Sequence, residues 1–216
     1  MGTASTLSAT IASTDADFRA HSVRVTELAA RIGQVLRVPD RVEAAIRIGG
    51  PLHDVGKLEI SDEILSKPGP LDADEVAEIR RHPVTGAAMV RPFRHLRAGL
   101  GCVLHHHERW DGGGYPHGLS GDAIPLEARI LSVADAWDAM VSDRPYRDAL
   151  ETGDALAEVG RCRGTQFDPD VADALLRLHA DQSVAQTSSF VRVRAITSSV
   201  NSDVVALPLR SDVLTP

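Results

Sequence analysis

Apolar residues recur at helical spacing through most of this 216-residue chain, and this periodicity favours a mostly helical body. The apolar patterns typical of strands occur only near the C-terminus, at 190–196 and 203–209. The sequence therefore predicts an all-α fold with a short irregular or β-like tail. The clearest amphipathic stripe lies between residues 18 and 36 and consists of Val25, Leu28, Ile32 and Leu36.

Glycine and proline divide the periodic region into separate elements. Gly49, Gly50 and Pro51 interrupt one helix, and Pro83 suits the first turn of another. We expect a flexible arm, a helical domain and a tail that is a hairpin, an edge that docks on a partner, or disordered. These three parts span residues 1–14, 15–180 and 181–216. The elements expected in the domain are helices near 18–36, 40–48, 72–81, 96–107, 126–140, 153–161 and 169–179, a short segment at 62–67, and a glycine-rich loop at 111–121.

Charge and composition exclude several classes of protein. The formal net charge of -7 lacks the basic excess that binding to bulk nucleic acid requires, so a nucleotide partner must be held by a local site. The most apolar stretch, 124–141, is interrupted by four charged residues, and we expect no membrane span. Cys102 and Cys162 have no paired spacing and residues 1–14 lack a signal-peptide pattern, which indicates a cytoplasmic location.

Histidine is concentrated in one part of the chain, because eight of the nine histidines lie between His21 and His117. Taken singly, a histidine or aspartate more often packs in a core, caps a helix or faces solvent, and that alternative stays open for each. As a set, nitrogen and oxygen ligands without thiolate suit iron, manganese, zinc or similar ions. The candidate ligands are five histidines and two aspartates, namely His21, His53, Asp54, His82, His106, His107 and Asp135.

Three consecutive histidines at 105–107 lead directly into the glycine-rich loop. Neighbouring helical residues point about 100° apart, so two of them can approach one cation from either side of a helix end. The glycines before Tyr115 allow the backbone to approach a ligand closely. An accidental histidine patch is the alternative. The role of His105 is left open, and orientation of a neighbouring imidazole is one alternative. His95, His117 and His179 are expected to be solvated or to make local hydrogen bonds.

Seven segments carry a more specific signal than any single residue. They are HDVGK at 53–57, SDEILSKPGPL at 61–71, HPVTG at 82–86, HHERWDGGGYPHGLSGDAIPLEARI at 106–130, VADAWDAM at 133–140, RPYR at 144–147 and FDPDV at 167–171. In this order and spacing they resemble the HD-GYP domain, the bacterial cyclic di-GMP phosphodiesterase branch of the HD phosphohydrolase superfamily. The resemblance covers about residues 15–180.

This resemblance implies an HD-superfamily helical core with additional C-terminal helices and a centre of two or three divalent metal ions, typically iron or manganese. Asp54 would bridge two ions. One ion would be completed by His21, His53 and Asp135, and the other by His82, His106 and His107. Lys57 would lie beside the reacting phosphate. The residues that match substrate contacts of the family are Tyr115, Asp138, Arg144 and Arg147.

The function implied is hydrolysis of cyclic di-GMP to pGpG, and onward to GMP, by a metal-bridging hydroxide. The catalytic residues would be Asp54 and Lys57. A second hypothesis keeps the metal centre but assigns another cyclic dinucleotide or phosphoester as the substrate. A third is a non-catalytic module that binds cyclic di-GMP or docks on a diguanylate cyclase or other signalling protein.

Three departures from the family pattern affect these expectations. Asp17 stands where members with three metals carry a glutamate, so a third ion would depend on this shorter carboxylate. The Gly49-Gly50-Pro51 interruption precedes the His-Asp pair and is expected to shift His53 slightly. Phe18 and Arg19 are larger than is common there and would narrow the mouth of the site. No sensor or receiver segment precedes the domain in this sequence, so regulation is expected from oligomerisation, such as a homodimer, from expression, metal supply or a partner, or else the chain is a piece of a longer protein.

Overall fold

The computed structural model describes residues 16–143 and 148–181. Within these ranges the chain forms helices joined by turns and no strand, which confirms the all-α prediction. The chain divides into two compact units, 1–178 and 179–216. The predicted arm and nearly all of the predicted β-like tail lie outside the described residues, as do Arg144 and Arg147.

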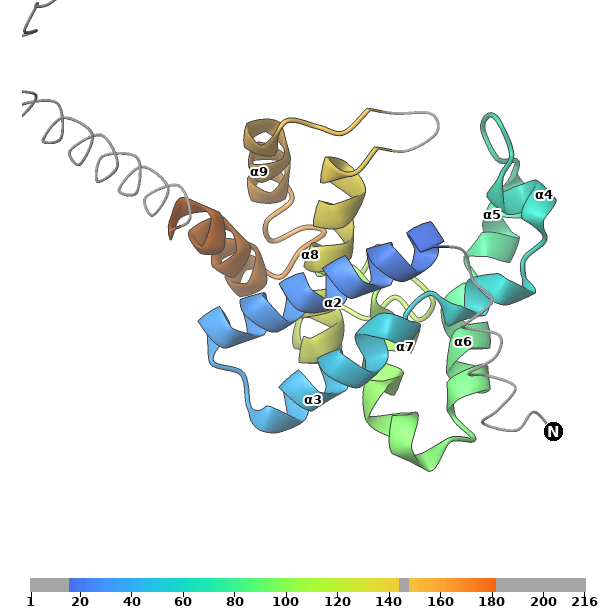
Figure 1. The fold of residues 1–216 in the computed structure, drawn as a ribbon, viewed down its shortest axis with the longest axis horizontal. Helices are drawn as coiled ribbons and strands as arrows, with labels where there is room; N and C mark the ends of the chain where they lie inside the picture. Colours follow the sequence, from blue (N-terminus) through green and yellow to red (C-terminus); the bar gives the residue numbers. More distant parts are fainter. Residues whose placement is uncertain (1–15, 144–147, 182–216) are drawn as a thin grey trace, which may run out of the picture. The chain divides into compact units, whose positions relative to one another are not determined.

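Among the described residues, the larger of two apolar cores lies along α2 (Ala16–Leu36), which packs against α3 (Asp40–Gly49) and α8 (Leu126–Val141) (Figure 1). The predicted stripe of α2 faces inward, since Val25 and Ile32 are fully buried. Burying a side chain of this size contributes about 1.5–3 kcal/mol. Helix α9 (Thr152–Arg161) packs on α8, and a further helix runs from 169 to 181.

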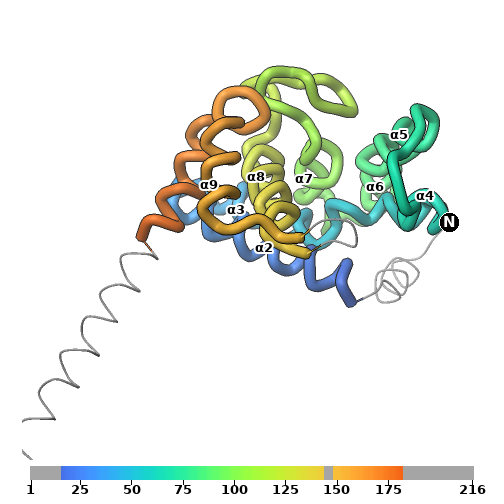
Figure 2. The backbone as a smooth tube through the Cα atoms, turned by 90° about the horizontal axis from the view of Figure 1, so that it is seen from above, coloured from blue at the N-terminus to red at the C-terminus, as the bar shows by residue number. Residues whose placement is uncertain are grey.

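A smaller apolar core joins the elements between residues 50 and 105. It is formed by η1 (Gly50–Leu52), η2 (Val55–Glu59), α6 (His82–Val90) and α7 (Leu100–His105). Its buried residues are Leu52, Val55, Ala87, Val90 and Val103. Figure 2 shows α6 together with α4 (Asp62–Leu65) and α5 (Ala73–Ile79) on the side of the fold away from α9.

Most predicted boundaries agree with the structure. Helix α5 begins with a capping box between Asp72 and Glu75, and Pro83 lies in the first turn of α6. The expected single helix at 96–107 is wrong, because η3 (Arg94–Gly99) is a 3-10 helix that precedes the shorter α7. Gly99 and Gly101 weaken α-helix formation at this junction. The glycine-rich loop contains one short 3-10 helix, η4 (Gly121–Ala123).

The Gly49-Gly50-Pro51 interruption brings the chain close to α2. A Cβ atom on Gly50 would lie 2.4 Å from Thr26 Oγ1, so a larger residue would push η1 away from α2. This approach places His53, the residue after η1, near the start of α2. Cys102 and Cys162 are buried and unpaired, and no described helix is long and apolar enough to cross a membrane.

Candidate metal centre

The predicted ligands come from separate elements and meet at one place. His21 lies on α2 and Asp135 on α8, whereas the others follow η1, begin α6 or follow α7. Four of these side chains are almost completely withdrawn from solvent, which is unusual for titratable groups without a specific partner. They are His53 at 0%, Asp54 at 4%, His82 at 1% and His106 at 1% exposure.

Asp54 lies at the middle of this arrangement, with its two oxygens facing different imidazoles. Its Oδ1 lies 3.3 Å from His82 Nε2 and 3.7 Å from His106 Nε2. Its Oδ2 lies 3.5 Å from His53 Nε2 and 4.0 Å from His21 Nε2. This is the position expected for a carboxylate shared by two cations.

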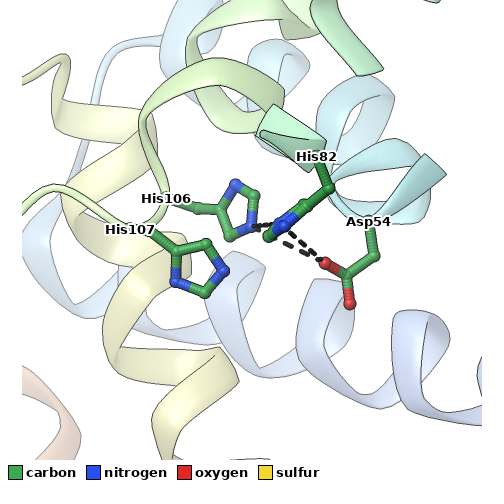
Figure 3. Close-up of side chains that lie close together, drawn as sticks. All are labelled: Asp54, His82, His106 and His107. Atoms are coloured by element: carbon green, nitrogen blue, oxygen red, sulfur yellow. Dashed lines mark hydrogen bonds and ion pairs between the residues drawn. The ribbon is translucent and has the colours of Figure 1, made fainter. Parts of the chain in front are cut away.

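Two ligand groups share Asp54. In the first, His82, His106 and His107 join Asp54, and Figure 3 shows these four side chains turned toward one another. In the second, His21 and His53 join Asp54. Asp135 extends the second group, because its Oδ1 lies 3.3 Å from His21 Nε2 and 4.0 Å from His53 Nε2.

Hydrogen bonds at Nδ1 select the tautomer in which Nε2 is free to coordinate a metal. A carbonyl oxygen only accepts, so a neutral imidazole that donates through Nδ1 carries a lone pair on Nε2. Three buried histidines make this bond to the backbone: His53 to Gly50 at 2.7 Å, His82 to Ile79 at 2.7 Å, and His106 to Cys102 at 3.0 Å.

The lone pairs then face one another. His82 Nε2 and His106 Nε2 are 3.3 Å apart, although neither carries a proton in this tautomer. His53 Nε2 and Asp54 Oδ1 are buried and have no hydrogen-bond partner. Buried polar atoms without partners are destabilising. One cation in each ligand group would satisfy all of these atoms, so the donor set fits divalent metals of the N/O-binding class.

Two residues of the first group, Asp54 and His107, have pKa values shifted toward their ligand forms. Burial alone would raise the pKa of Asp54, but His53 and Lys57 hold it well below its usual value. Burial and the neighbouring His106 lower the pKa of His107 to about 2. Because a metal binds the deprotonated side chains, these residues need to lose no proton at neutral pH.

His21 behaves differently. Burial lowers its pKa, but hydrogen bonds to Asp135 and Asp138 outweigh burial and raise the pKa to about 9. Without a cation, His21 is therefore protonated at neutral pH. A metal that binds through His21 Nε2 must displace this proton.

Asp138, predicted as a substrate contact, is bonded to residues of α2. Its Oδ2 lies 2.8 Å from His21 Nδ1, and Arg24 donates to both carboxylate oxygens at 2.6 and 2.9 Å. Only 6% of Asp138 is exposed. In this position the carboxylate orients His21, and its contact with a substrate stays a prediction.

Lys57 and Tyr115 border the ligands. Lys57 donates to Asp54 Oδ2 at 2.6 Å and keeps 32% of its side chain exposed. The Tyr115 ring stacks on His107, with centroids 4.8 Å apart and planes inclined by 22°. The Arg80 guanidinium lies 5.3 Å from the same ring.

A pocket of about 190 Å³ adjoins the ligand cluster, and Arg80 and Tyr115 belong to its wall. Among the described residues, no ion pair involves Arg80, and its guanidinium lies over the Tyr115 ring. This cation therefore remains available to an anion. The remaining lining residues include His106, His107, Ser132 and Gln166.

Sequence reasoning missed Arg80 and the role of Glu108. The Glu108 carboxylate is buried and accepts from the backbone amides of His117 and Leu119 at 2.8 and 3.0 Å, which fixes the glycine-rich loop. Its position after the histidine run was the only signal. Asp17 lies exposed in the first turn of α2 and belongs to neither ligand group, so its predicted role in a third ion gains no support from this geometry.

Comparison with known proteins gives a consistent match. A family model described as HD domain matches residues 5–171. The chain is 44% identical over 156 residues to the cyclic di-GMP phosphodiesterase response regulator RpfG of Xanthomonas campestris, covering 71% of this chain and 41% of that protein. It is 37% identical over 169 residues to a cyclic di-GMP phosphodiesterase of Thermotoga maritima, covering 77% and 46%.

Other relatives carry a different substrate in their names. The chain is 35% identical over 172 residues to the 3'3'-cGAMP-specific phosphodiesterase 2 of Vibrio cholerae, covering 79% of this chain and 33% of that protein. The chain thus spans less than half the length of these curated relatives. Among solved structures, Bd1817 of Bdellovibrio bacteriovorus matches with a TM-score of 0.62 at 21% identity, covering 82% of this chain and 58% of that one, which supports the fold.

Proposed function

The chain belongs to the HD domain family, and on this basis we propose that it is a metal-dependent phosphodiesterase that hydrolyses cyclic di-GMP to pGpG, and onward to GMP. The observation that carries the proposal is the environment of Asp54, whose two oxygens face separate imidazoles with nitrogens aimed at common points. The names of the relatives support the substrate class.

The residues present fit two divalent ions, and we propose iron or manganese. His82, His106 and His107 would hold one ion with Asp54, and His21, His53 and Asp135 would hold the other with the same carboxylate. Bound there, the ions would act as Lewis acids and lower the pKa of coordinated water. Hydrolysis consumes one water, breaks one P–O bond and leaves a proton on the departing 3′ oxygen.

The protein's own residues would bind and orient the dinucleotide. The Lys57 ammonium lies beside Asp54 and is partly exposed to solvent. There it would neutralise negative charge that develops on the phosphoryl oxygens. Arg80 offers its guanidinium at the pocket wall and suits a second phosphate or a guanine edge. Asp138 holds His21 in its coordinating orientation.

A mixed cyclic dinucleotide is a second candidate substrate, favoured by the 35% identity to a relative named for 3'3'-cGAMP. The predicted contacts Arg144 and Arg147, which lie outside the described residues, would help to decide between bases. We place the reaction in the cytoplasm, since buried, unpaired Cys102 and Cys162 suit a reducing compartment. A diguanylate cyclase partner and a homodimer stay predictions.

Metal content and turnover, measured on the same protein preparation, test the proposal. The full chain is purified without oxygen, its iron and manganese are quantified, and it is incubated with cyclic di-GMP, 3'3'-cGAMP and cyclic di-AMP while products are separated by chromatography. We expect pGpG to appear first from cyclic di-GMP, and Asp54→Ala to lose both metals and turnover. Metal-loaded protein that hydrolyses none of the three would refute the proposal.

A further inference from the structure

A second cluster of metal-binding side chains lies where α7 meets the glycine-rich loop. His105 ends α7, and His117 lies on the loop beyond Tyr115. The Nδ1 atoms of these two histidines approach one carboxylate oxygen, Glu108 Oε1, at 3.7 and 4.0 Å. One ligand atom from each of the three residues lies within 4.8 Å of the other two, and the ligand groups around Asp54 contain none of these residues.

These separations are too long for hydrogen bonds. His105 Nδ1 is nevertheless buried and has no hydrogen-bond partner. The Glu108 side chain is fully withdrawn from solvent and is fixed by the two backbone amides that it accepts from. Buried charges in proteins are usually paired or bound to a metal, and a cation in this gap would pair with the carboxylate and give the buried His105 Nδ1 a partner.

The spacing suits a small ion. Metal bonds of about 2.0–2.1 Å in a tetrahedral site place neighbouring ligand atoms about 3.3 Å apart. The corresponding distances at Asp54 range from 3.3 Å to His82 up to 4.0 Å to His21. The distances of 3.7 and 4.0 Å at Glu108 fall within the upper part of this range. The rings of His105 and His117 are close together, with centroids 5.4 Å apart and planes inclined by 50°.

We propose that His105, Glu108 and His117 bind one divalent ion of the zinc class, separate from the ions at Asp54. Two histidines and one glutamate form a known zinc ligand set, and the half-exposed His117 leaves a fourth position open to water. The ion joins the loop to the end of α7. It thereby fixes the backbone on both sides of Tyr115, which forms part of the pocket wall next to His107.

The site is tested by counting ions in the full chain. Wild type, His117→Asn and the matched control His95→Asn are saturated with zinc and freed of unbound metal. The zinc ions bound per chain are then counted by elemental mass spectrometry. His95 is exposed on η3 and belongs to none of the ligand groups. We expect His117→Asn to hold one zinc ion fewer per chain than the wild type and His95→Asn. Equal zinc content in all three proteins would overturn the proposal.

A second comparison removes the contribution of the larger centre. Asp54→Ala and the double variant Asp54→Ala/His117→Asn are titrated with cobalt, whose visible absorption reports tetrahedral coordination. The single variant should show one cobalt site that the double variant lacks. If the two titrations coincide, the cluster binds no metal, whatever the outcome of the phosphodiesterase assay.

Discussion

Gly56 packs directly against the backbone of His82. A Cβ atom on Gly56 would lie 2.0 Å from the His82 carbonyl oxygen and 2.6 Å from the Gly86 nitrogen. The absence of a side chain lets η2 lie on the first turn of α6. Because Asp54 immediately precedes η2, this contact sets the 3.3 Å separation between Asp54 Oδ1 and His82 Nε2.

Gly56→Ala is expected to separate Asp54 from His82. The clash is with backbone atoms, which cannot turn aside, so we expect a cost of about 3 kcal/mol in the free energy of unfolding. The number of metal ions bound per chain should fall, because Asp54 and His82 would no longer be close enough to share one ion. Denaturant unfolding and metal quantification measure both effects. Gly160→Ala is the control, since a Cβ there meets nothing within 4 Å and should stabilise α9 by about 0.5 kcal/mol. Unchanged metal content in Gly56→Ala would contradict this account.

The candidate ligands could be selected from the sequence because histidine and aspartate carry nitrogen and oxygen atoms that bind metals. The nitrogen that each histidine leaves free for a metal could not be predicted. The choice of Nε2 in His53 and His82 depends on where the carbonyls of Gly50 and Ile79 point at two helix ends, and this follows only from the folded backbone. Arg80 was missed for a similar reason, because its relation to Tyr115 is formed by tertiary packing.

The helices could be predicted where an apolar stripe faces a core, as in α2. The prediction failed at 96–107, where apolar residues continue through Gly99 and Gly101 but the backbone tightens into η3 before α7 begins. Periodicity reports which residues are apolar and does not distinguish a 3-10 helix from an α-helix over so few residues.

The metal-free protein should lose a stabilising contribution from His21 as pH rises. The folded pKa of His21 is raised to about 9, above its ordinary value of 6.5, by Asp135 and Asp138 against the effect of burial. The contribution is therefore complete below pH 6.5 and disappears as pH rises through 9. We expect the difference in Tm between chelator-treated wild type and His21→Asn to shrink across this range. A difference that stays constant or grows from pH 6.5 to 9 would exclude this coupling, and His95→Asn should follow the wild type.

Arg80→Ala should weaken substrate binding more than it slows the chemical step. Arg80 lies at the pocket wall near Tyr115 and belongs to neither ligand group, so it would contact the dinucleotide in both ground and transition states. We expect KM for cyclic di-GMP to rise on the order of tenfold, as loss of a charged hydrogen bond implies. Steady-state kinetics with Arg81→Ala as the neighbouring control measures this. A fall in kcat at unchanged KM would show that Arg80 acts in another way.

Lys57 is one of only two lysines in a chain that otherwise uses arginine, and its counterpart Lys67 provides a matched control. Lys67 pairs with Glu75 at 2.6 Å on α5, whereas Lys57 lies 2.6 Å from Asp54 Oδ2. Lys57→Ala should lower kcat about 10²- to 10³-fold, because a charge that stabilises the transition state is lost. Lys57→Arg should keep the metals but recover little of kcat, since a planar guanidinium cannot replace a compact ammonium in this position. Turnover and metal content, measured together, separate these effects. Equal losses in Lys57→Ala and Lys67→Ala would assign lysine a role in stability alone.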